Sequence, residues 1–388
     1  MRLLIVSALE HYRQDGTVMA GWAPVVREFE YLSELFDEIR HVAPLHPGAA
    51  PKHARRYPPQ IELVAIKPAG GPRSRDKFGL LIEAANYTRV LVHELARADA
   101  VFIRCPSNVG LVAVFLLTLL RRPRLRWIKY AGDWTPAGND HLSYRLQRLC
   151  LRYAPHRAEV TVNSSERTGA HIHNFLNPSY SQDEWRKAAE LTQHKSISRP
   201  IRLLFVGRLD KAKGVIRAAQ CFLELRRRDC DVRLDIVGEG PEGPALDALI
   251  QSAGVEHAVR RHGWLDNAEL NRLYRQAHFM VLPTSSEGWP KVVSEAMAFR
   301  VVPVIGAVSC IPEFFGKTAS GVCAPFDQPI CFAAAIDELV RNDAKWRAKA
   351  DNAQAAAERF TYERHLENVR RMLNLPSNPT ARQRAEAA

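Results

Sequence analysis

The chain has 388 residues, of which 46% are hydrophobic and 25% are charged. These proportions are typical of an ordinary globular protein, and the length allows two or three domains that each bury a core. The longest apolar run, residues 109–120, is well short of the roughly 20 residues of a membrane span. Seven cysteines without a C-x-x-C pair predict neither a zinc site nor a disulfide framework. Together with an amino-terminal run, MRLLIVS, that is too short for a signal peptide, they favour a cytoplasmic protein.

The net charge of +12 is unevenly distributed. Residues 1–180 carry 24 Lys and Arg against 16 Asp and Glu, whereas the remainder carries 30 against 26. Basic clusters lie at Lys52–Arg56, Arg73–Lys77 and Arg121–Lys129. The first half is therefore expected to meet an acidic partner. Nucleic acid is not expected, because the chain has no zinc-finger spacing, RNP-like string or basic stripe interleaved with aromatic residues.

Expected strands and helices alternate through the first 180 residues, which predicts a parallel sheet with both faces covered. The expected strands are 2–7, 39–43, 61–66, 100–104, 125–130 and 158–163, and the expected helices are 25–39, 78–97, 109–121 and one that ends near 176. The apolar helix 109–121 has two interpretations, an interfacial membrane element or the buried crossover of a βαβ unit. Its lack of a polar face and its closely flanking strands favour the buried crossover.

The segment after the first strand, residues 8–24, is interpreted as a long loop. Loops that leave the carboxyl ends of strands line the ligand crevice of a doubly wound sheet. His11, Asp15, Gly16 and Gly21 are therefore candidates for contact with an acceptor, and a surface loop without a ligand is the alternative. The strand 125–130 leads to Asp133 at the same edge, where this residue is either a ligand contact or a turn or capping aspartate.

A polar stretch follows, and residues 181–200 are interpreted as a linker between domain 1–180 and domain 201–360. The strand and helix pattern then resumes. Strands are expected at 201–206, 232–237, 279–282, 301–305 and near 321–324, and helices at 214–228, 291–299, 329–340 and 344–360. A last helix is expected within residues 361–375, and the polar residues 376–388 are expected to be disordered.

Two glutamates flank an expected helix start. Glu287 lies on a loop, and Glu295 lies inside the helix that can begin after Pro290. A helix amino terminus offers free N–H groups and partial positive charge, which suit a phosphate, whereas the carboxylates must face hydroxyls. A nucleotide-diphosphate sugar has its groups in that order: sugar hydroxyls, diphosphate and ribose hydroxyls.

Two cations follow the strand 201–206 and its terminal Gly207. Arg208 offers a bidentate fork and Lys213 a point charge, so the pair suits a diphosphate. A tight turn at Gly238 lies after the next strand, where a glycine can approach a nucleotide closely. The only D-x-D, Asp229–Asp231, precedes its strand and so lies at the opposite edge of the sheet, and no metal site is expected.

The string SSEGWPKVVSEAMA, residues 285–298, resembles the E-x7-E signature of the retaining family 4 glycosyltransferases of GT-B fold. Three further strings resemble blocks of that family in the right order, namely FVGRLDKAKG at 205–214, IVGEGPE at 236–242 and HGWL at 262–265. Together they cover nearly the whole second half of the chain. The pattern departs at Arg300 and Val302, where the family commonly has Gly and then Pro.

The resemblance implies an α/β protein of GT-B fold, with two Rossmann-like, doubly wound parallel-sheet domains and a C-terminal helix that crosses back to the first. In the family, the residue matching Glu287 contacts the transferred sugar and that matching Glu295 contacts the ribose. Asp133 matches the aspartate of the family's His–Asp pair, but Gly132 stands where the histidine is expected. The implied catalytic residues are Arg208, Lys213, Glu287 and Asp133. The implied donor-binding residues are Gly207, Arg208, Lys213, Gly238, Trp264, Leu265, Glu287, Gly288, Trp289, Pro290, Lys291, Val292 and Glu295.

The function expected from the resemblance is that of a retaining hexosyltransferase that needs neither metal nor other cofactor. Its donor is a UDP- or GDP-sugar, and its acceptor is a glycan or lipid-linked molecule in polysaccharide, lipopolysaccharide or glycolipid assembly. The basic first half adds an anionic membrane surface as an expected partner. The alternatives are a GT-B-like phosphorylase, a sugar-nucleotide epimerase or a non-catalytic nucleotide-binding scaffold. The joint presence of two glutamates and two cations favours the active enzyme.

Overall fold

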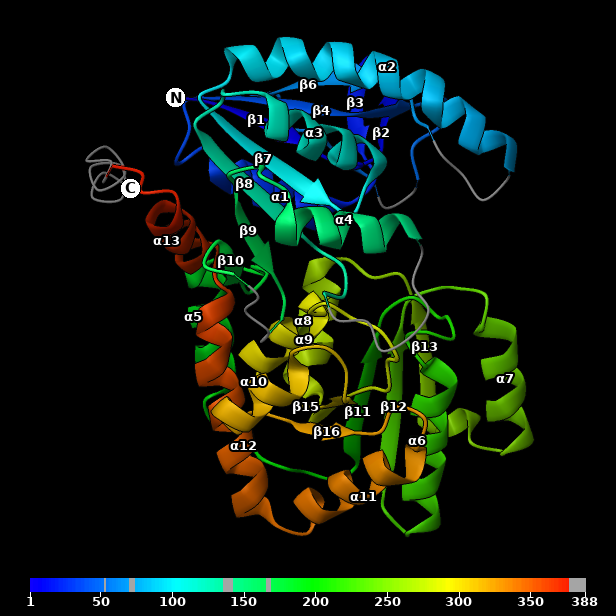
Figure 1. Ribbon diagram of the computed structural model, residues 1–388. Coiled ribbons are helices and arrows are strands. Elements are labelled where there is room, and N and C mark those ends of the chain that lie inside the picture. Colours follow the sequence, from blue (N-terminus) through cyan, green and yellow to red (C-terminus); the bar gives the residue numbers. More distant parts are fainter. Residues whose placement is uncertain (52–53, 70–73, 135–141, 165–168, 377–388) are drawn as a thin grey trace. The chain divides into compact units, whose positions relative to one another are not determined.

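The computed structural model describes residues 1–51, 54–69, 74–134, 142–164 and 169–376, with the backbone alone for residues 74–82. Internal contacts divide the chain into two compact units (Figure 1). The first comprises Met1–Phe175 and the segment from His365 onward, and the second comprises Leu176–Arg364.

A predominantly parallel sheet forms the centre of the first unit (Figure 1). Its strand order is β10-β9-β8-β7-β1-β4-β2-β3-β5, and β6 also pairs with β4. The pairs β2–β3 and β3–β5 are antiparallel, and the other pairs are parallel. The strands are β1 (Arg2–Val6), β2 (His11–Gln14), β3 (Thr17–Ala20), β4 (Glu38–His46), β5 (Arg55–Arg56), β6 (Ile61–Ile66), β7 (Ala100–Cys105), β8 (Leu125–Tyr130), β9 (Glu159–Val162) and β10 (Ile172–Asn174).

Helices cover both faces of this sheet, as the alternation predicts. The helices are α1 (Ala23–Leu32), α2 (Ser74–Arg97), α3 (Asn108–Leu119), α4 (Leu142–Tyr153) and α13 (Tyr362–Met372). On β1, Leu3 and Ile5 pack in one core with residues of α1 and α13, while Leu4 and Val6 pack in another with residues of α2 and α3. This alternation follows from the two-residue period of a strand. Helix α3 contributes Val109, Ala113 and other residues to the second core, in agreement with its interpretation as a buried crossover.

Three expectations for the first unit are wrong. Residues 8–24 do not form one long loop: they contain the hairpin β2–β3, which turns at Asp15 and Gly16 with positive φ at both residues. The expected helix 25–39 ends at Leu32, because the chain turns there to bury Leu35 and Phe36 before β4 begins. A helix was expected near 176, but residues 172–174 form β10, which extends the sheet beside β9.

The second unit contains a parallel sheet with the order β13-β12-β11-β14-β15-β16. Its strands are β11 (Ile201–Val206), β12 (Val232–Val237), β13 (Val259–Gly263), β14 (Phe279–Leu282), β15 (Val302–Gly306) and β16 (Val322–Ala324). This is the 3-2-1-4-5-6 order of a doubly wound fold. Such a sheet places its ligand crevice at the carboxyl ends of the strands where the order reverses, here between β11 and β14.

Helices α5 to α12 pack around this sheet (Figure 1). They are α5 (Gln182–Thr192), α6 (Val215–Arg227), α7 (Gly243–Ser252), α8 (Asn267–Gln276), α9 (Lys291–Ala298), α10 (Ile311–Thr318), α11 (Pro329–Val340) and α12 (Asp343–Ala357), with short 3-10 turns at Glu256–Ala258 and Glu358–Phe360. The sequence did not lead us to expect α4, α5, α7, α8 or α10. The expected linker 181–200 instead contains α5, which has a Ser181–Glu184 capping box and contacts α8 and α9.

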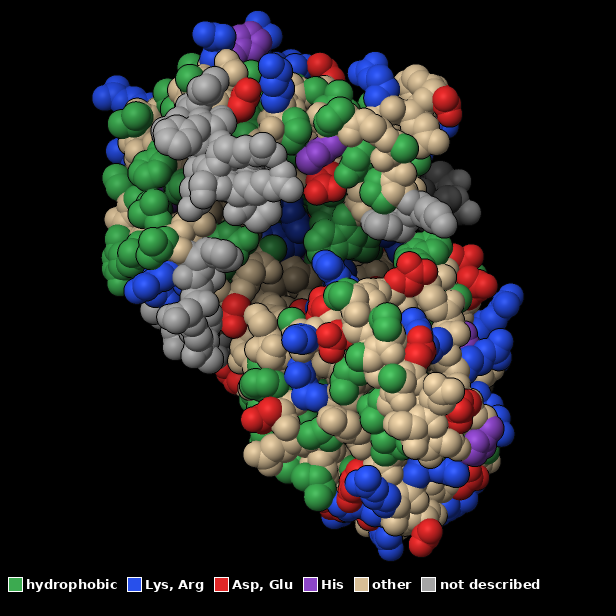
Figure 2. Space-filling view, turned by 90° about the vertical axis from the view of Figure 1, so that its right-hand side faces the viewer, with side chains coloured by type: hydrophobic (Ala, Val, Ile, Leu, Met, Phe, Trp, Pro, Cys, Tyr) green, Lys and Arg blue, Asp and Glu red, His purple; other side chains and the backbone are tan. Residues whose placement is uncertain are grey.

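Among the described residues, no helix has the length and apolar character needed to cross a membrane. Basic and acidic side chains are interspersed over the face shown in Figure 2, and hydrophobic side chains also reach this surface in groups. The cluster Arg73–Lys77 and part of Lys52–Arg56 lie outside the described side chains, as do residues 377–388 of the expected disordered tail.

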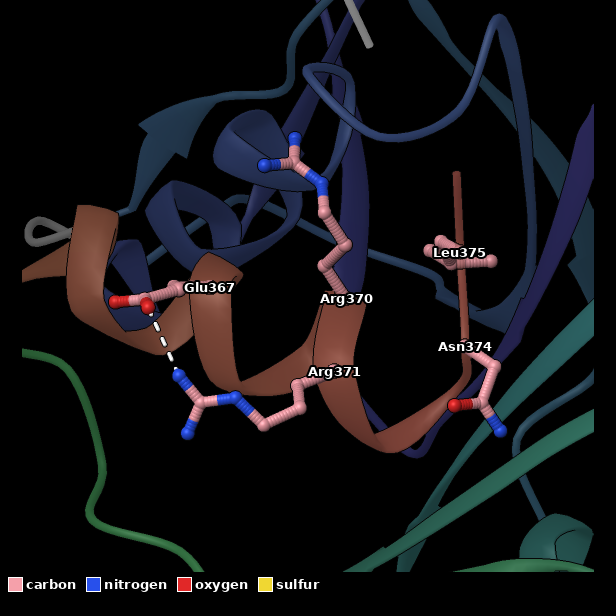
Figure 3. A pocket seen from close by; sticks show the side chains of 5 residues that line it. All are labelled: Glu367, Arg370, Arg371, Asn374 and Leu375. Carbon is pink, nitrogen blue, oxygen red and sulfur yellow. Dashed lines mark hydrogen bonds and ion pairs between the residues drawn. The ribbon is translucent and has the colours of Figure 1, made fainter. Parts of the chain in front are cut away.

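A shallow pocket of about 430 Å³ lies beside the end of α13 (Figure 3). Its lining residues are Glu367, Arg370, Arg371, Asn374 and Leu375. Arg371 Nη2 donates a hydrogen bond of 2.8 Å to Glu367 Oε1. The lining thus comes from one short segment, and none of the predicted site residues belongs to it.

Candidate active site

The loops that follow β11 and β14 meet at the carboxyl edge of the second sheet. The backbone N–H of Ser285 donates to the carbonyl of Ala212 at 2.8 Å. Arg217 donates to the carbonyl of Pro283 from Nε at 3.1 Å and from Nη2 at 2.8 Å. The two loops are therefore held together at the point where the strand order reverses.

Glycine is required where these loops approach most closely. Gly214 has φ of +78°, and a Cβ there would lie 2.3 Å from the carbonyl oxygen of Pro283. Gly238 has φ of +127°, and a Cβ there would lie 2.0 Å from the carbonyl oxygen of Gly207. Both the backbone conformation and the space therefore exclude a side chain. The glycine at 238 is thus required by its approach to Gly207, and the predicted approach of Gly238 to a nucleotide stays a prediction.

Lys213 and Glu287, from these two loops, form an ion pair between Nζ and Oε1. The backbone N–H of Lys213 also donates to Asp210 Oδ1 at 2.8 Å, which fixes the start of its turn. Arg208 differs, since 71% of its side chain is exposed and its Nε lies 3.7 Å from Asp210 Oδ2. One cation of the predicted clamp is thus engaged by a carboxylate, and the other lies largely in solvent.

Helix α9 begins behind this ion pair. Pro290 is its N-cap, and the proline side chain makes no capping hydrogen bond. The helix dipole and the N–H groups of its first turn make a helix amino terminus favourable for an anion. Glu287 precedes this end on the loop, whereas Glu295 lies more than one turn into the helix. The sequence-based order of carboxylate, helix end and carboxylate is therefore present.

Glu295 is held by a residue that the sequence did not identify. Tyr274 Oη, from α8, donates to Glu295 Oε2 at 3.0 Å. Burial and, secondly, the charge of Glu295 raise the pKa of Tyr274 well above its usual value, so the phenol remains protonated. Lys195 Nζ donates to the backbone carbonyl of Tyr274 at 2.9 Å. A tyrosine in an amphipathic helix has no sequence signal that separates this role from ordinary packing.

The remaining predicted donor-binding residues lie at the same carboxyl edge of the second sheet, and among them the Trp289 side chain is buried. Gly207, Gly238, Trp264 with Leu265, and Gly288 to Val292 follow β11, β12, β13 and β14 in turn. The Trp264 side chain is 61% exposed, while Leu265 packs against the core. Trp289, in contrast, is only 4% exposed. Its ring centroid is 4.8 Å from that of Phe360, in a stacked arrangement, so only its backbone is placed to meet a donor.

The predicted acceptor residues and Asp133 belong to the first unit. His11 is fully buried, with ring centroids 5.2 Å from His41 and 4.6 Å from Tyr57. Burial is also the main reason why its pKa is lowered to about 4. His11 therefore presents no exposed atom to an acceptor, and its side chain is part of the core. Gly16 lies in the hairpin turn, Gly21 follows β3 and Asp133 follows β8; their roles remain predictions.

Two doubly wound units of this kind define the GT-B fold of glycosyltransferases, and solved structures share it. Sucrose-phosphate synthase from Thermosynechococcus elongatus matches with a TM-score of 0.68 and 16% identity over 100% of each chain. Anabaena Alr3699/HepE in complex with UDP and glucose matches with a TM-score of 0.67 and 17% identity, over 96% of this chain and 99% of that one. At such low identities these matches show the fold alone.

Residues 186–359, slightly less than half of the chain, match the family described as Glycosyl transferases group 1. Over these residues the chain is similar to group 1 glycosyltransferases. Alpha-D-kanosaminyltransferase of Streptomyces kanamyceticus is 28% identical over 172 residues, 44% of this chain and 44% of that protein. The chain spans about one third to one half of the length of the curated relatives it matches.

Proposed function

We propose that this protein is a retaining hexosyltransferase that moves a sugar from a nucleotide-diphosphate sugar to an acceptor hydroxyl. One arrangement carries the proposal: the Lys213–Glu287 pair lies before the amino terminus of α9, with Arg208 exposed on the neighbouring loop. A diphosphate fits the cations and the helix end, and sugar hydroxyls fit the carboxylate. The family match of the second unit supports the same class of reaction.

The main catalytic contribution would be stabilisation of the leaving group. When the bond between the anomeric carbon and the diphosphate breaks, negative charge develops on the diphosphate. In this proposal Arg208, Lys213 and the first N–H groups of α9 stabilise this charge electrostatically. A diphosphate that binds Lys213 would compete with the carboxylate of Glu287, which is then released to accept hydrogen bonds from the sugar.

Retention follows in this proposal from attack on the face that the diphosphate leaves. The acceptor oxygen bonds to the anomeric carbon, and the acceptor's proton passes to an oxygen of the departing diphosphate. This scheme requires no metal and no side-chain nucleophile. Asp229 and Asp231 immediately precede β12, at the amino edge of the sheet, which removes the D-x-D from the site.

The proposed donor is a UDP- or GDP-sugar, since a neighbour in fold was solved with UDP and glucose and a relative is named as a kanosaminyltransferase. The proposed acceptor is a glycan or lipid-linked molecule in polysaccharide, lipopolysaccharide or glycolipid assembly. An anionic membrane surface at the cytoplasmic face is a further proposed partner, because residues 1–180 carry a charge of +8.

A two-stage experiment tests the proposal. Thermal-shift measurements with UDP, GDP and their sugars identify the donor, because a ligand that binds only the native state raises its stability. The donor is then incubated with candidate acceptors in the presence and absence of EDTA, and NMR determines the anomeric configuration of the product. Transfer with retention in EDTA supports the proposal. Sugar release that requires inorganic phosphate indicates a phosphorylase, acceptor-independent isomerisation indicates an epimerase, and binding without turnover indicates a scaffold.

A further inference from the structure

Helix α4 of the first unit has polar residues on its buried side and apolar residues on its exposed side. Gln147 and Arg148 are 2% and 8% exposed, so two polar residues occupy its inner face beside Leu151. Gln147 Oε1 accepts a hydrogen bond of 3.0 Å from the backbone N–H of Ser107. Arg148 Nη1 donates to the hydroxyl of Tyr130 at 2.9 Å. Polar contacts thus attach much of the inner face of α4 to the rest of the first unit, whereas an ordinary surface helix is attached through an apolar face.

The opposite side of α4 carries an apolar stripe. Leu142, Leu146, Leu149 and Tyr153 are 80%, 45%, 52% and 76% exposed. Their spacing of four, three and four residues aligns them along one side of a helix. Exposed side chains contribute little to folding, so packing does not account for three leucines in this position. A contiguous exposed apolar surface of this kind usually marks an interaction site.

The charges around the α4 stripe indicate what covers it. Helix α4 contains three arginines and no acidic residue, and Arg145 is exposed. Helix α3 contacts α4 and ends at Leu119, which is 79% exposed. The exposed residues Arg121, Arg122 and Arg124 follow it. Leucines and a tyrosine on a helix that has arginines and no acidic residue of its own suit an anionic lipid surface, where apolar atoms enter the acyl boundary and cations meet phosphates.

We propose that α4 docks on an anionic lipid bilayer, lying in the interface plane with the α4 stripe inserted. Helix α4 would thus be the element that contacts the membrane surface named in the proposed function. The docking rests on that function in one respect only, namely that it brings the protein to a lipid-linked acceptor. It differs from attraction by charge alone in one measurable respect. Salt screens the arginines to a reach of about 8 Å at physiological strength but leaves the apolar insertion in place.

Vesicle flotation of the full-length protein tests the α4 stripe directly. The variants are Leu146→Ser and Leu149→Ser, and the matched control is Leu191→Ser on α5, where the leucine is 54% exposed in the second unit. We expect wild type and control to bind vesicles that contain phosphatidylglycerol. Each α4 variant should bind about tenfold more weakly, the value for losing a largely buried leucine at the interface. The melting temperature should stay unchanged because the substituted side chains are exposed.

A charge arm separates the two contributions. Reversing Arg121 and Arg122 to Glu should lower binding to anionic vesicles by at least fivefold per residue. Neither α4 leucine variant should be more sensitive to salt than wild type. Vesicle binding of Leu146→Ser and Leu149→Ser equal to wild type would overturn the proposal. So would a dimer in light scattering that these variants abolish while vesicle binding is absent, because the stripe would then be an interface between two copies. Because flotation needs no donor, failure of sugar transfer with intact vesicle binding would reject the proposed function alone.

Discussion

Replacing Glu287 by Gln is expected to separate nucleotide binding from sugar transfer. In the structure the Glu287 side chain is 11% exposed and pairs with Lys213, which is 30% exposed. A neutral amide keeps the shape of the carboxylate but loses its charge. Lys213 is then free to bind a diphosphate, and a negative charge is removed from its vicinity. The affinity for free UDP or GDP should therefore rise rather than fall.

The magnitude follows from the partial exposure of the pair. Two unit charges 4 Å apart attract by about 4 kcal/mol at an effective dielectric constant near 20. Desolvation, screening and side-chain entropy reduce the net value to about 1 kcal/mol for a pair with a solvent-exposed partner. Release of Lys213 should thus tighten nucleotide diphosphate binding about fivefold. Loss of charged hydrogen bonds to sugar hydroxyls, worth about 1.5–3 kcal/mol, should lower kcat/KM about ten- to a hundredfold.

Calorimetric titration with UDP and GDP and initial rates with the matching sugar nucleotide measure the two effects. Glu295→Gln is the control, because Glu295 is predicted to contact the ribose, which the free nucleotide and the donor share. That variant should weaken nucleotide binding and transfer together. If Glu287→Gln loses as much affinity for free nucleotide as Glu295→Gln, the assignment of Glu287 to the sugar is wrong.

Further predictions concern the clamp, the support of Glu295, acid stability and backbone strain. Arg208→Ala and Lys213→Ala should each lower kcat about a hundredfold, by analogy with the roughly 3 kcal/mol lost with one oxyanion donor; normal turnover in either variant would reject the clamp. Tyr274→Phe should weaken nucleotide binding about fivefold in calorimetry, since Glu295 loses a hydrogen bond worth about 1 kcal/mol; unchanged affinity would contradict this role. Burial lowers the pKa of His278 to about 4, so on acidification this histidine is protonated in the unfolded state before it is protonated in the folded state. His278 alone should contribute a fall of about 3 kcal/mol in the free energy of unfolding between pH 6.5 and pH 4, and His278→Asn should make the urea midpoint less dependent on pH over that range. Arg300→Gly should be about 1 kcal/mol more stable to urea than Arg300→Ala, because Arg300 has φ of +57°; equal stabilities would refute the strain argument.

Elements bounded by strong local signals were predicted best. The expected strand 201–206 coincides with β11, which lies between Pro200 and Gly207, and the expected helix 329–340 coincides with α11. Apolar runs that end at Pro or Gly constrain both the type of element and its limits. The same local signals predict which edge of the sheet carries Arg208, Lys213 and Glu287. In a parallel sheet, residues just after successive strands must lie at one edge.

The direction and burial of individual side chains could not be predicted in this way. Trp289 follows Glu287 on the same loop, yet its indole stacks on Phe360, which lies far away in the chain. His11 sits beside an Asp15–Gly16 turn that signals a hairpin, but its burial depends on His41 and Tyr57 from other elements. Tyr274 meets Glu295 only because α8 and α9 belong to one core. Such contacts are set by tertiary packing, which local periodicity does not encode.

Arg300 connects the departure from the family pattern with the rigidity of the site. It follows the end of α9 with left-handed backbone geometry, φ +57°, which is the conformation that makes glycine common at this position. An arginine there carries a strain of roughly 1–2 kcal/mol. Its Nη1 donates to the carbonyl of Gln193 at 2.8 Å, and its Nη2 pairs with Asp351 at 2.5 Å. These contacts offset the strain and tie the carboxyl end of α9 to residues after α5 and in α12. Since Glu295 lies on the same short helix, a fixed carboxyl end also limits how far the amino end of α9 can move relative to Lys213.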